Sequence, residues 1–460
     1  MNLSDWISFE NRAFRASFFL YALVGLLGFI LVVTNAKLLS PFFLLVGIAL
    51  YLVDKKMLLV VLYLVYLPTN GLINRDDFLF GVLGIQQILG VLTVISLFSI
   101  KSQVALSEFQ KVASRLILVL IAYASYTFFK NAVFGLMDSN MLDAAKKIIN
   151  VFLLFGPLIL VLHKCSSNSF KGWVAISLFL GTLNQAIFCF LSPFLPNLGF
   201  YSQGTDAFFI STKTENISRF VGVMGNGDSN SLGAFFVISI GFFLSRSRAF
   251  NQSLLIKVLC ALCVVAIALT NSRTAFLSLS IIGMLFLAKS GSGKVKLQFL
   301  VGVVLLAIAT LPLWETLLDR LSGAGSEQLN TDTSSNRIGK WLLYFNHFFS
   351  HPTTFIHGSP QTILVGFKDI FLAAHNFYIQ VIYNSGLVFL WLFAAQLLHI
   401  FKIMKSNVSI YSLSFIMIPF MAITFFVSDF GVFFYFSLFL ALNAAKTSIK
   451  DSVNLTPVVT

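Results

Sequence analysis

The chain has 460 residues, of which 57% are apolar and only 11% are charged, and 52 of them are phenylalanine. A water-soluble domain of ordinary composition is far less apolar, so the sequence predicts a protein that lies almost entirely in a lipid bilayer. The formal net charge of +13 sorts by side of the membrane, as shown below, which argues against nucleic acid as a partner.

Apolar segments alternate with short charged loops along the whole chain. Fourteen segments of roughly 15–28 residues are long enough to cross about 30 Å of hydrocarbon when tilted or slightly short. They predict an all-α, polytopic transmembrane helix bundle with about 14 spans (12–14), forming a single integral membrane domain over residues 1–460. The spans begin near Phe18, Leu39, Met57, Leu79, Leu116, Ile148, Gly172, Leu232, Leu254, Thr274, Leu297, Asn376, Ser409 and Phe430.

The ionisable residues test the orientation of these spans. With the N-terminus in the cytoplasm, the cytoplasmic side receives 19 of the 31 basic residues and five acidic ones, whereas the outer side receives 12 basic and 13 acidic residues. The cytoplasmic loops then carry +14 and the outer loops −1. This asymmetry follows the positive-inside rule, so we expect both termini in the cytoplasm.

Four cysteines lie within or at the edge of the spans: Cys165, Cys189, Cys260 and Cys263. Cys260 and Cys263 form a CxxC pair, but they lie on an apolar span with no second pair and no nearby histidine. Packing is the better reading of this pattern. We expect no disulfide, no metal site and no cofactor.

Two outer loops are long, at about residues 200–231 and 314–375. Long polar loops on one side of a membrane protein indicate that its function is carried out there. Within the second loop, residues from Ile338 to Phe349 place bulky apolar side chains at helical spacing. They predict a short surface helix, which either lies over a lateral opening or merely covers the ends of the spans.

The first long loop ends in a glycine-rich polar run from Arg219 to Gly233. No strand precedes the run and no Gly-Lys-Ser/Thr triplet follows it, so nucleotide binding is not expected. A re-entrant or unwound start of the eighth span explains it better, because exposed backbone at that depth must face protein or a water-filled cavity. Asn226, Asp228 and Asn230 would then line that cavity.

Three arginines and one histidine are predicted at the same outer membrane level. Arg219 opens the glycine-rich run, Arg273 lies in the tight turn between the ninth and tenth spans, and Arg337 precedes the surface helix. A single arginine at a membrane boundary is commonly a snorkelling anchor or a contact to lipid headgroups. Guanidinium groups also bind phosphate oxygens in pairs and stay charged at any relevant pH, so converging arginines would form a diphosphate site.

His375 opens the twelfth span in the sequence Ala-Ala-His-Asn. A histidine at a helix start is often a cap or a hydrogen-bonded surface residue. Gly386 lies eleven residues on, about 20° away at 100° per residue, so both would share one helix face on which another helix could approach closely. A neutral imidazole can remove a proton from a sugar hydroxyl. Asn376 is assigned to the lining of the same cavity.

In this order, these segments resemble the bacterial O-antigen polymerase and O-antigen ligase superfamily of integral-membrane glycosyltransferases. The resemblance covers about the second half of the chain, and the first half matches only as apolar spans. The matching pieces are Arg219 with Gly-Asn-Gly-Asp-Ser-Asn at 225–230, Asn271-Ser-Arg273, Asn336-Arg337 with Trp341, His351-Pro352, His357-Gly358, and His375-Asn376 with Gly386.

The resemblance implies a GT-C-like fold and transfer of a glycan from undecaprenyl diphosphate at the periplasmic face of the bacterial inner membrane, without metal and with inversion. Arg273 and Arg337, with Arg219 as third candidate, would hold the diphosphate, and His375 would activate the acceptor hydroxyl. The partners implied are a lipid-linked oligosaccharide, the bilayer, a chain-length regulator and a flippase.

Polymerase and ligase use the same type of donor, and the sequence leaves both open. The ligase pattern of His-Asn, nine residues, Gly, two residues and then Gly, Thr or Tyr fits through Gly386, but this chain has Phe389 at its end. That departure, with fourteen spans where ligases have about a dozen, favours a polymerase that extends a lipid-linked repeat unit over a ligase that transfers glycan to lipid A core. A polysaccharide or lipid transporter is less favoured, because the two halves show no internal repeat.

Overall fold

The described part of the chain is predominantly helical. The computed structural model describes residues 3–68, 83–99, 106–134, 141–165, 167–191, 229–245, 253–270, 272–289, 293, 297, 337–359, 365–367, 370–372, 374, 376–406 and 442. Its elements are α1 (Leu3–Trp6), α2 (Arg12–Asn35), η1 (Ala36–Leu38), α3 (Leu39–Leu52), α4 (Lys56–Tyr66), α5 (Ile85–Phe98), α6 (Glu108–Val133), α7 (Met141–Lys164), α8 (Asn168–Leu191), α9 (Ser229–Ser245), α11 (Leu254–Thr270), α12 (Arg273–Lys289), α15 (Arg337–Ser350), α16 (Thr354–His357), β1 (Val365–Phe367), β2 (Ile370–Leu372), α17 (Phe377–Ser385) and α18 (Leu387–Ser406).

Apolar helices stand where the sequence predicted spans. Among the described residues, four are long and apolar enough to cross a bilayer: Arg12–Leu31, Glu108–Val133, Met141–Lys164 and Ser169–Leu191. Seven further apolar helices have 10–17 residues, α3, α4 and α5 among them. The predicted spans that begin near Ser409 and Phe430 lie outside the described residues, as does all but one residue of the span near Leu297.

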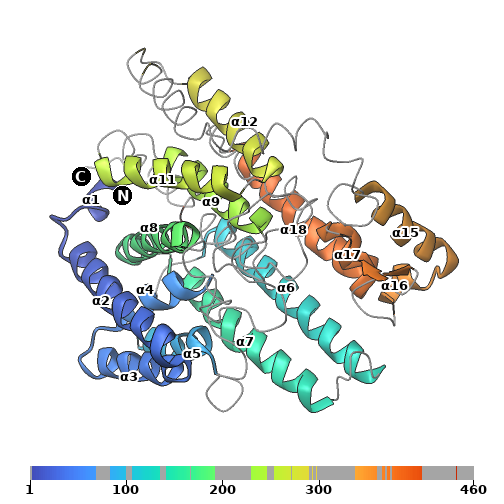
Figure 1. Ribbon diagram of the computed structural model, residues 1–460, viewed down its shortest axis with the longest axis horizontal. Helices are drawn as coiled ribbons and strands as arrows, with labels where there is room; N and C mark the ends of the chain where they lie inside the picture. The colour runs from blue at the N-terminus through green and yellow to red at the C-terminus, as the bar shows by residue number, and fades with distance from the viewer. Residues whose placement is uncertain are drawn as a thin grey trace, which may run out of the picture.

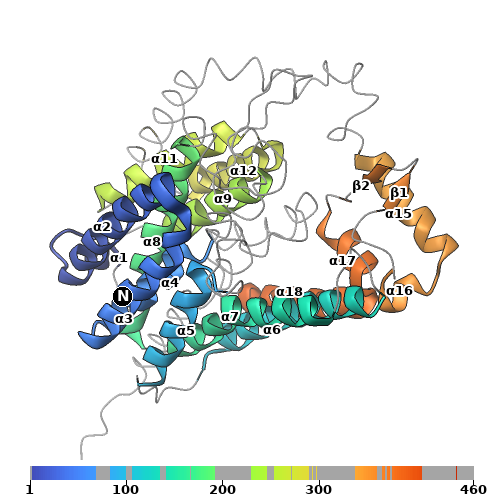
Figure 2. The same cartoon turned by 60° about the horizontal axis from the view of Figure 1, so that its bottom comes forward.

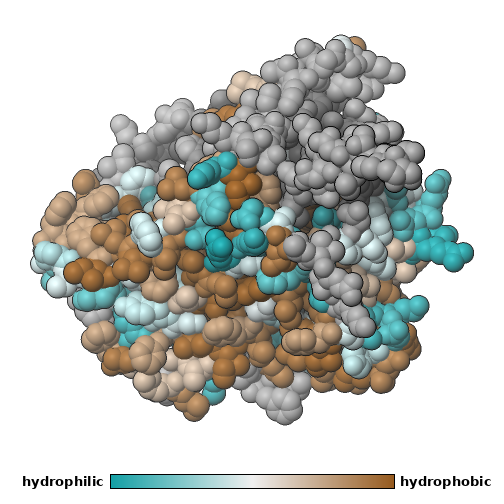
Figure 3. All heavy atoms as spheres, turned by 180° about the vertical axis from the view of Figure 1, so that it is seen from behind, coloured by the Kyte–Doolittle hydropathy of each residue, from teal (hydrophilic) through white to brown (hydrophobic). Residues whose placement is uncertain are grey.

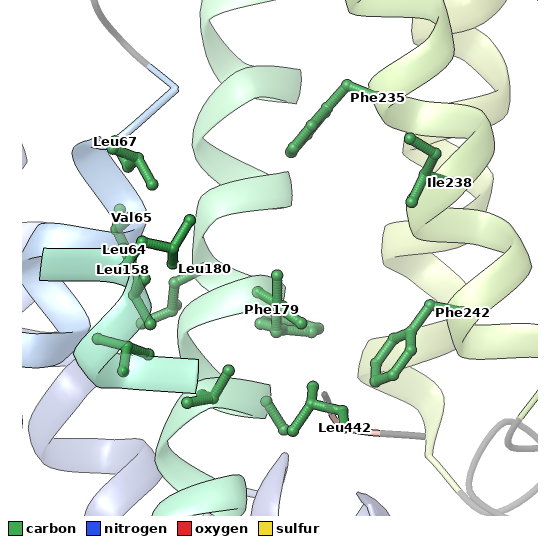
Figure 4. Close-up of a cluster of buried hydrophobic side chains, with 14 of the residues drawn as sticks. Leu64, Val65, Leu67, Leu158, Phe179, Leu180, Phe235, Ile238, Phe242 and Leu442 are labelled. Carbon is green, nitrogen blue, oxygen red and sulfur yellow. The ribbon is translucent and has the colours of Figure 1, made fainter. Parts of the chain in front are cut away.

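Helix α4 runs through the interior of the bundle. Every side chain from Leu59 to Leu67 is buried, because α4 is covered by α3, α5 and α8. The sequence could not separate such an interior helix from a lipid-facing span, since both are continuously apolar. Figure 4 shows the core beside it, with Phe179 and Leu180 of α8 between the side chains of α4 and those of α9.

Helices α6, α7 and α18 pack side by side and form the longest part of the described molecule (Figure 2). Helices α2 to α5 lie at one side of the molecule, and α15, α16 and α17 lie at the other side (Figure 1). A separate small hydrophobic cluster holds α15 to α17, with Tyr344, Phe348, Ile379 and Tyr383 at its centre. The segment that carries the predicted surface helix therefore has a core of its own.

Apolar side chains cover much of the described surface in Figure 3. Phe19 and Leu26 of α2 are 65% and 60% exposed, and Leu142 of α7 is 65% exposed. A water-soluble protein rarely exposes so much contiguous apolar surface, whereas a bilayer requires it. The four cysteines are free and buried.

One feature adds to the predicted fold and another departs from it. The second long loop contains a short antiparallel hairpin, in which Val365 of β1 pairs with Leu372 of β2, whereas the other described elements are helical, as the predicted all-α class requires. In addition, the twelfth span is not continuous, because α17 ends at Ser385 and α18 begins at Leu387. The prediction that His375 and Gly386 share one helix face was therefore wrong.

Candidate active site

The structure describes the predicted site residues to different extents. The side chains of Asn230 and Asn376 are described, whereas Arg273 and Arg337 are described only as the first residues of α12 and α15. Arg219, Asn226, Asp228 and His375 lie outside the described residues. The convergence of the three arginines on His375 therefore stays a prediction.

Asn230 connects the glycine-rich run to the turn that carries Arg273. Its Oδ1 accepts a hydrogen bond of 2.9 Å from the hydroxyl of Ser272. Helix α9 can approach this turn closely because residue 233 is glycine: a Cβ there would lie 2.7 Å from the Cβ of Ala275. Two of the predicted segments, far apart in the sequence, therefore meet in space.

Asn376 is the N-cap of α17. Its backbone is extended, with φ −146° and ψ 113°, and its Oδ1 accepts hydrogen bonds from the backbone N–H groups of Tyr378 and Ile379. These are two of the donors that a helix start leaves without an intrahelical partner. The cap sets the point at which α17 begins, directly after His375.

Residue 374, on the other side of His375, is also held in place. The backbone N–H of Ala374 donates to Oε1 of Gln380 at 3.1 Å, and its carbonyl accepts from Nε1 of Trp341 at 2.9 Å. Gln380 also accepts from the hydroxyl of Tyr344 at 3.4 Å. The two neighbours of His375 are thus held by α15 and α17.

The predicted surface helix is present as α15, and it has two apolar faces. Trp341, Tyr344 and Phe348 pack against the cluster around α17, whereas Leu342 and Phe349 are 55% and 74% exposed. A helix with one docked and one exposed apolar face suits the boundary between protein and bilayer.

His347 of α15 lies against Tyr383 and stacks on the ring of His351, with ring centroids 5.2 Å and 4.7 Å away. Burial, followed by repulsion from His351, lowers the pKa of His347. Its surroundings therefore favour the neutral form of the imidazole. The sequence analysis had assigned it no role in the site.

Gly386 marks a break between two helices. Its φ is +81°, and a Cβ at this position would collide with the carbonyl of Ile356 and the backbone nitrogen of His357. Gly358, directly after α16, has φ +82°, and a Cβ there would lie 2.5 Å from the carbonyl of Asn384. Both residues are thus held to glycine by backbone conformation and by contact. A segment does approach closely at Gly386, as expected, but it is the end of α16 and not a helix face.

Comparison with known proteins adds one finding to this geometry. Residues 258–394 match the family model of the O-antigen ligases. This stretch is similar to the O-antigen ligase domain. This confirms the resemblance to the O-antigen polymerase and ligase superfamily that the sequence motifs indicated. No curated protein and no solved structure matches the chain.

The matched stretch includes Arg273, Arg337, His375, Asn376 and Gly386. It begins after the glycine-rich run, so Arg219 and three predicted cavity residues lie outside it: Asn226, Asp228 and Asn230. The hydrogen bond between Asn230 and Ser272 nevertheless attaches the start of α9 to the matched stretch.

Phe389, where this chain departs from the ligase pattern, lies in the first turn of α18. Its ring centroid is 5.3 Å from that of Tyr126 and 6.0 Å from that of Tyr123, both on α6. A smaller residue at this position would leave the two tyrosines without that contact. The matched stretch is therefore packed against α6, which lies well before Arg219, the first site residue that the sequence analysis identified.

Proposed function

We propose that this protein is a surface polysaccharide (O-antigen) polymerase, a membrane glycosyltransferase that moves a growing glycan from undecaprenyl diphosphate to a lipid-linked repeat unit. The observation that carries this proposal is the match of residues 258–394 to the O-antigen ligase family. That stretch contains the histidine and two of the arginines that the chemistry requires. The capped start of α17 and the bonds to Ala374, which hold the two neighbours of His375, support the proposal.

In this reaction, His375 accepts the proton of an acceptor hydroxyl as the oxygen attacks the anomeric carbon of the donor sugar. The new bond joins the acceptor oxygen to the anomeric carbon, and the bond from that carbon to the diphosphate oxygen breaks. Undecaprenyl diphosphate leaves with the bonding electrons. Arg273 and Arg337, with Arg219, offset its negative charge, and a single displacement inverts the anomeric configuration without a metal ion.

The proposal includes the location of the enzyme. The whole chain, residues 1–460, forms one GT-C-like membrane domain of about fourteen spans in the bacterial inner membrane, with both termini cytoplasmic and the site periplasmic. The apolar helices of the described chain and the charge asymmetry of the loops support this arrangement. A flippase that delivers the lipid-linked repeat unit and a chain-length regulator are the expected partners.

A ligase that transfers the finished glycan to lipid A core is the second candidate, and the description of the matched family favours it. Phe389 favours the polymerase, because ligases have a glycine, threonine or tyrosine at this point of the motif. The ring of Phe389 packs on that of Tyr126, so α6 accommodates a phenylalanine at this position.

The surface polysaccharide ladder on a gel separates these functions. A strain lacking the protein is complemented with wild type, His375→Ala or His163→Ala at matched expression. His163 lies in the last turn of α7, outside the matched stretch, so His163→Ala should restore the full ladder. We expect His375→Ala to fail, leaving a single repeat attached to lipid A core.

Other outcomes decide against this proposal. Loss of every attached repeat in the strain lacking the protein would identify a ligase. A full ladder from His375→Ala would exclude His375 as the catalytic base. A normal ladder in the strain lacking the protein would exclude both glycosyltransferase functions and favour transport.

A further inference from the structure

One face of α6 is polar over its last three turns. Tyr123, Tyr126, Thr127 and Lys130 are spaced three and four residues apart, so they lie one above another on the helix. Lys130 is 5% exposed, and Tyr123 and Thr127 are buried beside it. Buried polar groups at the boundary of an apolar helix need partners, and a buried lysine needs them most.

Lys130 finds its partners in backbone carbonyls. Its Nζ donates to the carbonyl oxygen of Ser359 at 2.5 Å and to that of Asn384. Asn384 is in the last turn of α17, and Lys130 itself is in the last turn of α6. Carbonyls at the C-terminal end of a helix lack intrahelical partners and carry the negative end of the helix dipole, so they suit a cation with three donors. Within the described chain, no acidic side chain pairs with this ammonium group.

The other three side chains bind the same junction. The hydroxyl of Tyr126 donates to the carbonyl of His357 at 2.8 Å, and Oγ1 of Thr127 lies 3.1 Å from the hydroxyl of Ser385. The hydroxyl of Tyr123 accepts from Nδ2 of Asn384 at 2.8 Å. All four residues of α6 therefore hold two short stretches together, residues 357–359 and residues 384–385.

Hydrogen bonds lead from this junction to the turn that contains His375. Nε2 of Gln380 donates to Oδ1 of Asn384 at 3.3 Å, and Oε1 of Gln380 accepts from the backbone N–H of Ala374. Asn384 and Gln380 are therefore the two side chains that connect Tyr123 of α6 with the residue before His375. The position of Ala374 depends on the position of α17, which α6 holds at its far end.

We propose that Lys130, supported by Tyr123, Tyr126 and Thr127, is a positioning residue for glycosyl transfer. It binds the carbonyls of Ser359 and Asn384 and so holds α17, whose Gln380 and Asn376 fix Ala374 and the helix start on either side of His375. The inference rests on the proposed function for its effect on catalysis. Lys130 lies well before residue 258, where the matched stretch begins, so that stretch relies on a helix outside it.

The test uses the full-length protein in nanodiscs, with lipid-linked repeat units extracted from a strain that lacks the protein as the probe. Lys130→Met keeps the length of the side chain and removes its charge and donors. We expect kcat to fall about 100-fold, as a shift of about 1 Å at a catalytic group can produce. We expect KM to stay within about twofold, because Lys130 does not touch the donor.

Two further variants guard against a fold defect. Tyr126→Phe removes only the hydrogen bond to His357 and should lower kcat several-fold without affecting folding. Lys130→Ala leaves space beside the two carbonyls, and millimolar propylammonium, but not propanol, should restore part of its activity. Lys147→Met is the matched control, because Lys147 lies on neighbouring α7 with its Nζ 5.9 Å from the ring centroid of Phe128. It should behave as wild type.

A wild-type kcat in Lys130→Met would overturn the inference. A raised KM with unchanged kcat would also overturn it, because the lysine would then bind the donor directly. Amide hydrogen exchange of residues 374–386 tests the same inference without an activity assay. The exchange rate should rise in Lys130→Met and not in Lys147→Met. Equal exchange rates in the two variants would refute the inference. Inactivity of the wild type on the lipid-linked probe would refute the proposed function alone.

Discussion

At the scale of single residues, two glycines decide how the chain passes α17. Gly358 and Gly386 both have positive φ, and each faces the backbone of the opposite stretch, where no flexible side chain can move aside. The amide of Ser359 donates to the carbonyl of Tyr383 at 2.6 Å, so the two stretches touch directly. The glycine of the His-Asn motif is thus a structural requirement of the junction that Lys130 binds.

Gly386→Ala should destabilise the protein by at least about 1 kcal/mol. The alanine would have to keep a positive φ, and its Cβ would collide with the backbone of Ile356 and His357. The thermal midpoint of the detergent-solubilised protein measures this. Gly156→Ala is the matched control, since a Cβ at Gly156 meets nothing within 4 Å inside α7. An equal midpoint for the two variants would contradict the reading of Gly386.

The spacing argument for His375 and Gly386 failed for a reason that is visible at this scale. It assumed an uninterrupted helix, whereas Asn384-Ser385-Gly386 ends α17. Glycine after a polar pair is a common signal for the end of a helix. The strong apolar character of the residues that follow hid this signal, because hydropathy does not distinguish one long helix from two consecutive ones.

At the scale of elements, α15 combines a docked face and an exposed face. Its aromatic residues at helical spacing predicted the helix from Ile338 to Phe349, and the structure has it from Arg337 to Ser350. Which face docks was not predictable, since both faces are apolar. Contact with α17 decides it: Phe348 is fully buried, whereas its neighbour Phe349 is 74% exposed.

Phe348→Ala should therefore loosen α15, since removing a fully buried phenylalanine side chain typically destabilises a core by about 3–5 kcal/mol. Amide hydrogen exchange and limited proteolysis of residues 337–350 would both increase. Phe349→Ala makes the same chemical change one residue further on and should leave both measurements near wild type. If the two variants behave alike, the assignment of the docked face is incorrect.

At the scale of the whole molecule, the order of the helices predicts the side of each loop. The charge asymmetry predicts that the connection between α6 and α7 lies on the outer side and that between α7 and α8 on the cytoplasmic side. All four native cysteines are buried, so single introduced cysteines can report the orientation.

Met141→Cys, at an exposed position at the start of α7, should react with a membrane-impermeant maleimide in intact cells with a permeabilised outer membrane. Ser167→Cys, exposed between α7 and α8, should react only after the inner membrane is opened. The reverse pattern would invert the topology and move the proposed site to the cytoplasm. Mass spectrometry of the labelled protein reads the result.

The sequence by itself determined the membrane class, the positions of most described helices and the resemblance to the superfamily. Crossing hydrocarbon requires contiguous apolar residues, and the residues within each motif lie close together along the chain, so both signals are local. Only the tertiary structure decided that α4 is interior, that α17 and α18 are separate helices, and that Lys130 meets Ser359 and Asn384. The partners of Lys130 are more than 200 residues away along the chain, and packing alone selects them.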